Sequence, residues 1–146
     1  MDVFIRYLHF ISILLLAAAL IGQLFFLRRR MTRSAIRDLQ HLDILYALSV
    51  VVVLATGFAQ WFWVGKSAEF YSNNPVFHVK ITLFLIIGVI SAYPTIFFAR
   101  NKKGVPAEEV AVPALLHWSV RTEVILLIAM PLLASLMARG VGLRLE

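Results

Sequence analysis

Two histidines and two cations stand at the starts of two apolar segments, in a pattern that suits a cofactor. His9 lies near the start of the first apolar segment, with Arg6 one helical turn before it; His78 opens the third, followed by Lys80. If both segments cross a membrane in the same direction, the two imidazoles lie at similar depth. Paired imidazoles can provide both axial ligands of a b-type haem, and cationic side chains can bind its propionates. We therefore predict that His9, His78, Arg6 and Lys80 bind haem b.

Other chemistry is open to the same histidines. His9 and His78 could hold copper or zinc without a porphyrin, relay protons, or form ordinary hydrogen bonds at a membrane interface. A second pair, His41 and His117, is expected at the opposite membrane surface, where solvated or hydrogen-bonded histidines are the simpler interpretation. The chain has no cysteine, which excludes disulfides, a thiol nucleophile, thiolate metal sites and covalently attached haem. No motif for hydrolysis or phosphate binding is present.

The elements that must position these residues are membrane-spanning helices. The chain of 146 residues is 61% apolar and 15% charged, with a mean hydropathy of +0.86, which does not fit a soluble domain. A spanning helix needs about 20 mostly apolar residues. Four segments meet this need, near residues 5–27, 43–64, 76–99 and 115–138. We predict an all-α four-helix membrane bundle that forms one domain over residues 1–146, with Asn74 and Pro75 opening the third helix and Pro113 near the start of the fourth.

Basic residues indicate the orientation of these helices. The net charge is +6, and five arginines lie between residues 28 and 43, with one arginine and two lysines between 100 and 109. Because both segments flank apolar runs, we interpret them as cytoplasmic loops rather than as a nucleic-acid surface. Both termini are then expected on the outer side of the membrane.

Polar and small residues at steps of three and four define one face on each predicted helix. In a membrane such residues face protein, because a polar side chain in lipid is costly. Glu123 is expected to turn to an arginine, a tyrosine or water, with Asp43 and Tyr46 as candidate partners, in a structural clamp or a proton path, while Arg121 reaches the interface. The predicted inward faces are Arg6, His9, Ser12, Leu16, Ala19 and Gln23; Asp43, Tyr46, Ser49, Val53, Thr56 and Gln60; His78, Thr82, Leu85, Gly88, Ala92 and Thr95; and His117, Arg121, Val124, Ile128, Pro131 and Ser135.

Several strings carry a family resemblance over residues 5 to about 138. Tyr7-Leu8-His9, the run from Asn74 to Lys80, and Tyr93-Pro94-Thr95 resemble an uncharacterised bacterial family of four-span inner-membrane proteins, which implies a multi-pass protein of the bacterial inner membrane. More distantly, the helix-one histidine with His-x-Lys is similar to HemJ-type protoporphyrinogen oxidases and to CopD-type copper-resistance membrane proteins. The HemJ resemblance implies haem b, oxidation of protoporphyrinogen IX, and essential roles for His9 and Lys80.

Two functions of different classes follow from the sequence. The leading prediction is a haem b protein that serves electron transfer or porphyrin oxidation, with a quinone as electron partner; as an enzyme it would be an oxidoreductase of the protoporphyrinogen oxidase type. The alternative is a non-catalytic membrane subunit, or a small transport or copper-handling module. The lipid bilayer is the one partner common to both, nucleic acid is excluded as a partner, and a homo-oligomer is left open.

Overall fold

The computed structural model describes residues 1–64, 66 and 68–142. In this part of the chain, four helices are long and apolar enough to cross a membrane, which confirms the predicted fold class. The long helices are α1 (Asp2–Phe26), α2 (Arg33–Ala59), α4 (Pro75–Asn101) and α5 (Ala114–Ala138). The shorter elements are the π-helical turn η1 (Gln60–Val64), which continues α2, the helix α3 (Ala68–Ser72), and the strands β1 (Arg30–Thr32) and β2 (Glu109–Ala111).

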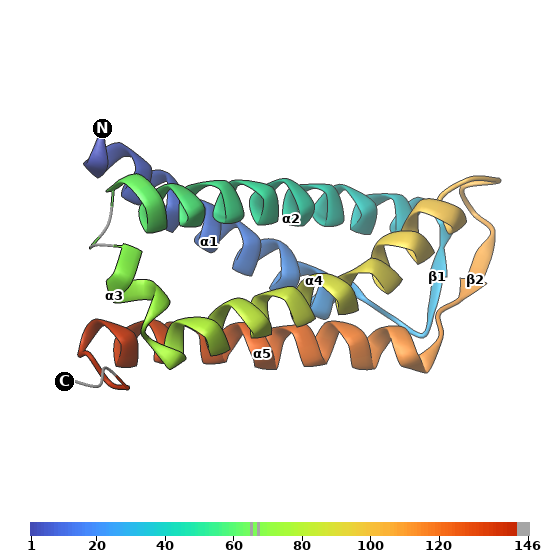
Figure 1. The fold of residues 1–146 in the computed structure, drawn as a ribbon. Helices are drawn as coiled ribbons and strands as arrows, with labels where there is room; N and C mark the ends of the chain where they lie inside the picture. Colours follow the sequence, from blue (N-terminus) through green and yellow to red (C-terminus); the bar gives the residue numbers. More distant parts are fainter. Residues whose placement is uncertain (65, 67, 143–146) are drawn as a thin grey trace.

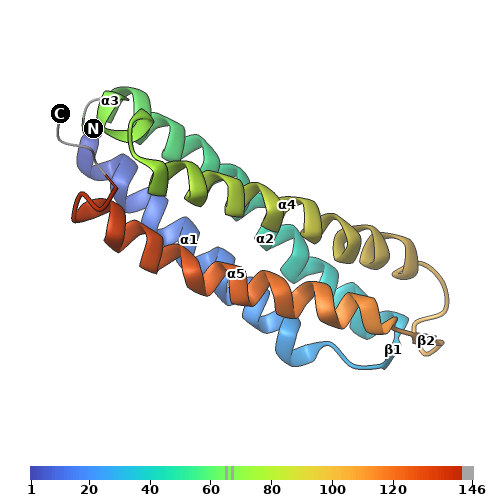
Figure 2. The same cartoon turned by 60° about the horizontal axis from the view of Figure 1, so that its bottom comes forward.

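The four long helices form a bundle with unlike ends (Figure 1). Within it α1 packs mainly against α2, and α4 mainly against α5; α1 also contacts α5, and α2 contacts α4. The two strands lie at one end, and the start of α1, the helix α3 and the end of α5 lie at the other (Figures 1 and 2). We call these the strand end and the terminal end. An outward orientation of the terminal end stays a prediction.

The inward faces of α1 and α2 match the sequence prediction except at Arg6, which is exposed. The buried residues on these faces recur at steps of three and four and include small and polar side chains, as expected where helices associate in lipid. The wide apolar remainder of each helix, such as Leu14 and Leu48, is exposed at the outer surface of the bundle. The buried residues are Ser12, Leu16, Ala19, Leu20 and Gln23 on α1, and Ile36, Leu39, Asp43, Tyr46, Ser49, Val53 and Thr56 on α2.

The inward faces predicted for the other two spans are largely wrong, although Thr95 and Val124 do face the interior of the bundle. On α4 the buried residues are Ile87, Pro94 and Phe98, and on α5 they are Leu116, Val120 and Glu123. Leu85 and Ile128, both predicted to face inward, are 59% and 70% exposed. Apolar side chains are stable both in lipid and in the bundle interior. The few polar residues near His78 and His117 therefore did not predict which face of each helix is buried.

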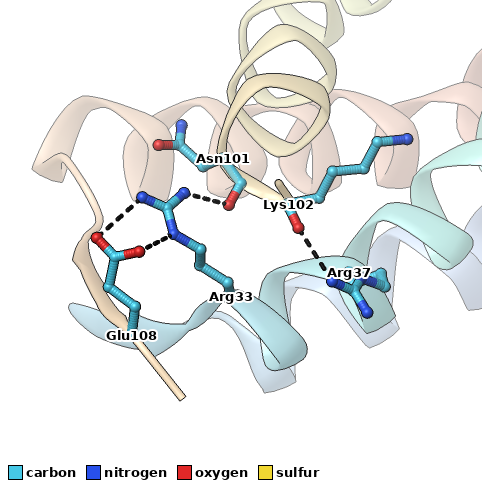
Figure 3. Close-up of polar contacts among 5 residues, drawn as sticks. All are labelled: Arg33, Arg37, Asn101, Lys102 and Glu108. Carbon is cyan, nitrogen blue, oxygen red and sulfur yellow. Dashed lines mark hydrogen bonds and ion pairs between the residues drawn. The ribbon is translucent and has the colours of Figure 1, made fainter. Parts of the chain in front are cut away.

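At the strand end, a two-stranded antiparallel sheet and an ion pair join the two basic segments. Arg30 pairs with Ala111 in the sheet, which the sequence analysis did not predict. Arg33 donates two hydrogen bonds to the Glu108 carboxylate, at 2.6 and 3.1 Å, and one to the Asn101 carbonyl at 2.9 Å (Figure 3). The Arg33 guanidinium lowers the pKa of Glu108 through these hydrogen bonds and its charge. The end of α4 and the strand β2 are thereby fixed to the start of α2.

Side-chain caps mark where α2 and α4 begin. Thr32 Oγ1 accepts a hydrogen bond from Ala35 N at the start of α2, and Asn74 Oδ1 accepts one from Val76 N at the start of α4. The cap at Asn74, with Pro75 in the first turn, is as predicted. Pro113 precedes the first residue of α5, close to its predicted place.

Candidate functional site

His9 on α1 is held by a hydrogen bond to α2 in the terminal half of the bundle. Its Nδ1 lies 2.8 Å from Thr56 Oγ1. The Thr56 hydroxyl donates its own proton to the carbonyl of Val52 at 2.6 Å, so its oxygen is left to accept from His9. This pattern assigns the proton to Nδ1 and leaves the lone pair of Nε2 available for a metal, a proton or a ligand.

The surroundings of His9 include a cation and a residue without a side chain. Lys80 of α4 is partly buried and lies within electrostatic range of the His9 imidazole. A methyl group at Gly57 would lie 3.6 Å from His9 Cε1, so glycine keeps one side of the ring uncovered. Arg6 is exposed and is paired with Asp2 at 2.8 Å. Of the two predicted propionate partners, Lys80 is therefore the one that the fold brings to His9.

The second predicted ligand, His78, lies elsewhere on the terminal end. Its side chain is exposed, and Nε2 donates to the carbonyl of Ser72 in α3 at 2.7 Å. Among the described residues, no hydrogen bond or ring contact joins it to His9. The described residues also contain no group of three or more metal-ligating side chains. The structure thus brings together His9, Thr56 and Lys80, and places His78 at the surface.

The two remaining histidines lie toward the strand end and face different surroundings. His41 is exposed and, with Arg37 and Lys103, lines an open pocket between α2 and the residues that follow α4. His117 donates from Nδ1 to the carbonyl of Pro113 at 3.2 Å, and its Nε2 is buried without a partner among the described residues. The first position agrees with the solvated histidine that the sequence favours.

A second polar group lies in the half of the bundle nearer the strand end. Gln23, Asp43, Tyr46, Thr95 and Glu123, which we call the inner carboxyl cluster, come from all four long helices; all but Thr95 are at most 4% exposed. Glu123 lies beside Tyr46, as predicted. Asp43 accepts hydrogen bonds from Gln23 and Thr95, links that the sequence analysis missed. The sequence could have indicated these links, because all five residues are polar and lie within the four predicted spans or at their edges.

Arg121 takes no part in this cluster. It is exposed on α5, with its guanidinium 5.7 Å from the centre of the Trp118 ring. An arginine at this position can reach the membrane interface while its stem covers apolar surface. Arg121 thus reaches outward as predicted, and its place on the predicted inward face of α5 is wrong, because only Glu123 of the two is buried.

Four apolar helices around buried polar side chains define a multi-pass membrane protein that contacts the lipid bilayer. Residues 1–142 match the model of the family described as predicted membrane protein (DUF2214), and the chain belongs to this family. No significant match is found among curated proteins or among solved structures. The resemblance to HemJ-type and CopD-type proteins is not shown by these comparisons and stays a prediction.

Proposed function

We propose that the protein is a membrane electron carrier that binds haem b with His9 as an axial ligand. The observation that supports this proposal is the Thr56 hydroxyl, which accepts the Nδ1 proton of His9 at 2.8 Å and leaves Nε2 free. Histidines that bind metals nearly always donate their other ring proton to a fixed acceptor, which sets the tautomer and the ring orientation. His9 meets this requirement before any ligand is present.

The residues near His9 fit one end of a haem. The haem iron would bind Nε2 of His9, and Lys80 would form an ion pair with a propionate. Arg6 is available for the second propionate at the rim of the terminal end, in exchange for its exposed pair with Asp2. When bound, haem supplies one-electron chemistry. His78 is exposed, and its Nε2 donates to the Ser72 carbonyl of α3, so we assign His9 alone as the histidine ligand in place of the predicted pair.

The proposal keeps the partners predicted from the sequence. A quinone in the bilayer is the proposed electron partner, and a porphyrin the proposed substrate if the protein is an oxidoreductase of the protoporphyrinogen oxidase type. We place it in the bacterial inner membrane, with the arginine-rich strand end in the cytoplasm. The alternative function is a non-catalytic membrane subunit, or a small transport or copper-handling module.

Titration with hemin tests the proposal. The purified protein in lipid nanodiscs is titrated with hemin, and the Soret absorbance gives the affinity and stoichiometry. We expect saturable binding by the wild type, its loss in His9→Ala, and unchanged binding in His41→Ala, which removes an exposed histidine near the other end of the bundle. Equal binding by wild type and His9→Ala would overturn the proposal.

The variant His78→Ala separates the two ligand sets. Unchanged hemin affinity supports His9 as the one histidine ligand, whereas loss of binding equal to that of His9→Ala restores the predicted pair. Copper bound stoichiometrically through His9 without hemin binding would favour the copper-handling alternative. A wild type that binds neither would favour a non-catalytic subunit or transport module.

A further inference from the structure

The inner carboxyl cluster leaves polar atoms without partners in the interior of the bundle. Tyr46 is 2% exposed and Glu123 is 1% exposed. By distance and angle, neither the Tyr46 hydroxyl nor Glu123 Oε1 makes a hydrogen bond among the described residues, although the two side chains lie next to each other. Tyr46 interacts electrostatically with the carboxyl groups of both Glu123 and Asp43. A cluster that only joined helices would satisfy its buried polar atoms, so this one has capacity to bind something more.

Asp43 is oriented by two neutral donors. Thr95 Oγ1 donates to Asp43 Oδ1 at 3.1 Å, and Gln23 Nε2 donates to the same oxygen at 3.4 Å. These bonds come from α4 and α1, so the carboxyl group is held from two sides of α2. They orient the group without neutralising it.

In the part of the chain that the structure describes, no cationic side chain pairs with either carboxyl group. The ion pairs of the described residues use Asp2, Glu108 and Glu109, and none includes Asp43 or Glu123. Facing the cluster, α1 and α4 provide Gln23, Ser91 and Thr95, which do not titrate, so the titratable groups there are Asp43, Tyr46 and Glu123. Two ionised carboxylates in a bundle surrounded by lipid repel each other and lose their hydration.

We propose that the inner carboxyl cluster is a proton-binding site, in which Asp43 and Glu123 together hold one exchangeable proton with Tyr46 as their shared neighbour. Binding takes the proton from water at one membrane surface onto a carboxylate oxygen, and release returns it, so no electron or co-reactant is involved. When two carboxyl groups share a site, each one-proton step of their titration belongs to the pair rather than to either residue. The cluster draws side chains from all four long helices.

Infrared spectroscopy detects this proton directly. The protein in lipid is studied in H₂O and D₂O across a pH series, and the C=O stretching band of a protonated carboxyl group is recorded. We expect this band at neutral pH in the wild type, with the isotope shift of an exchangeable proton. Asp43→Asn and Glu123→Gln should each remove it or shift its pH midpoint, and Asp38→Asn, an exposed carboxyl on the same helix as Asp43, should not.

Further variants keep the test decisive. If Asp43→Asn or Glu123→Gln fails to fold, Tyr46→Phe keeps the ring and removes one unpartnered hydroxyl; it should leave helicity intact and still shift the frequency or midpoint of the band. Absence of the band in the wild type at neutral pH overturns the proposal, as does a band unaffected in all three cluster variants. Loss of the band on adding sodium, but not an equal concentration of choline, would also overturn it in favour of a sodium site.

Discussion

Replacing Thr56 by valine removes the acceptor that fixes the tautomer of His9. Valine has nearly the same shape as threonine, so the packing of α1 on α2 is kept. The substitution deletes the Oγ1 atom that lies 2.8 Å from His9 Nδ1. A hydrogen bond of this kind contributes about 0.5–1.5 kcal/mol net. Loss of a partner behind a metal-binding histidine typically costs about 10- to 100-fold in affinity.

We therefore expect Thr56→Val to weaken hemin binding by about 10- to 100-fold, or about 1.4–2.8 kcal/mol. Thr56→Ser keeps the hydroxyl and should bind within a few-fold of the wild type. The assay is the hemin titration in nanodiscs, with circular dichroism to show that helicity is retained. Thr56→Val with wild-type affinity would refute the assigned tautomer, and so would equal weakening in Thr56→Ser.

Three predictions concern the scaffold that holds these sites. Glu108→Gln should lower the unfolding temperature at neutral pH and not in acid: Arg33 depresses the folded-state pKa of Glu108, so the stabilisation is complete above the unfolded-state pKa and is lost as pH falls through the folded value. Gly104→Ala should destabilise by more than about 1 kcal/mol, because Gly104 has φ +122° and an added Cβ would lie 2.7 Å from Arg33 Nε. Leu20→Ala, at 0% exposed, should cost about 2–5 kcal/mol, whereas Leu14→Ala, at 64% exposed, should cost less than about 0.5 kcal/mol in detergent unfolding.

Each of these predictions has a contradicting result. A Glu108→Gln effect that persists undiminished in acid would show that the carboxylate charge is not its source. A Gly104→Ala variant with wild-type stability would mean that the loop before β2 can relax away from Arg33. Equal losses in Leu20→Ala and Leu14→Ala would show that the assigned inner and lipid-facing sides of α1 are wrong.

The sequence was most informative where polar residues repeat at helical spacing. Ser49, Val53 and Thr56 follow one face of α2, and that face is buried. On α4 the buried residues are largely apolar, and nothing in Ile87 or Phe98 distinguishes them from residues that face lipid. Hydropathy thus predicts that these helices span the membrane, but it does not predict how they are rotated.

The arginines before residue 43 were interpreted only as a sign of membrane orientation, and the helix that they belong to was missed. The arginines between residues 28 and 43 led to the interpretation of a loop, yet α2 begins at Arg33, and Ile36 and Leu39 are buried against the bundle. A helix with apolar residues at this spacing and arginines on its other side fits both observations. The strand pairing involves three residues on each side and has no pattern long enough to detect.

In the candidate site, too, some features could be predicted from residue types and others depend on how the helices pack. His9 and Lys80 were predictable because a titratable side chain in an apolar span is costly and therefore informative. That His78 turns outward depends on the short helix α3, whose Ser72 carbonyl accepts the proton of Nε2, and no residue pattern predicted this helix. The link of Gln23 and Thr95 to Asp43 depends on the relative rotation of three helices.

The reduced-minus-oxidised visible spectrum of the protein, purified in mild detergent from haem-sufficient cells, tests the central claim most directly. We predict a sharp Soret band and α-band of a b-type haem in the wild type, their loss in His9→Ala, and their retention in His41→Ala. A featureless wild-type spectrum, or an identical spectrum in His9→Ala, would contradict the claim that His9 binds haem.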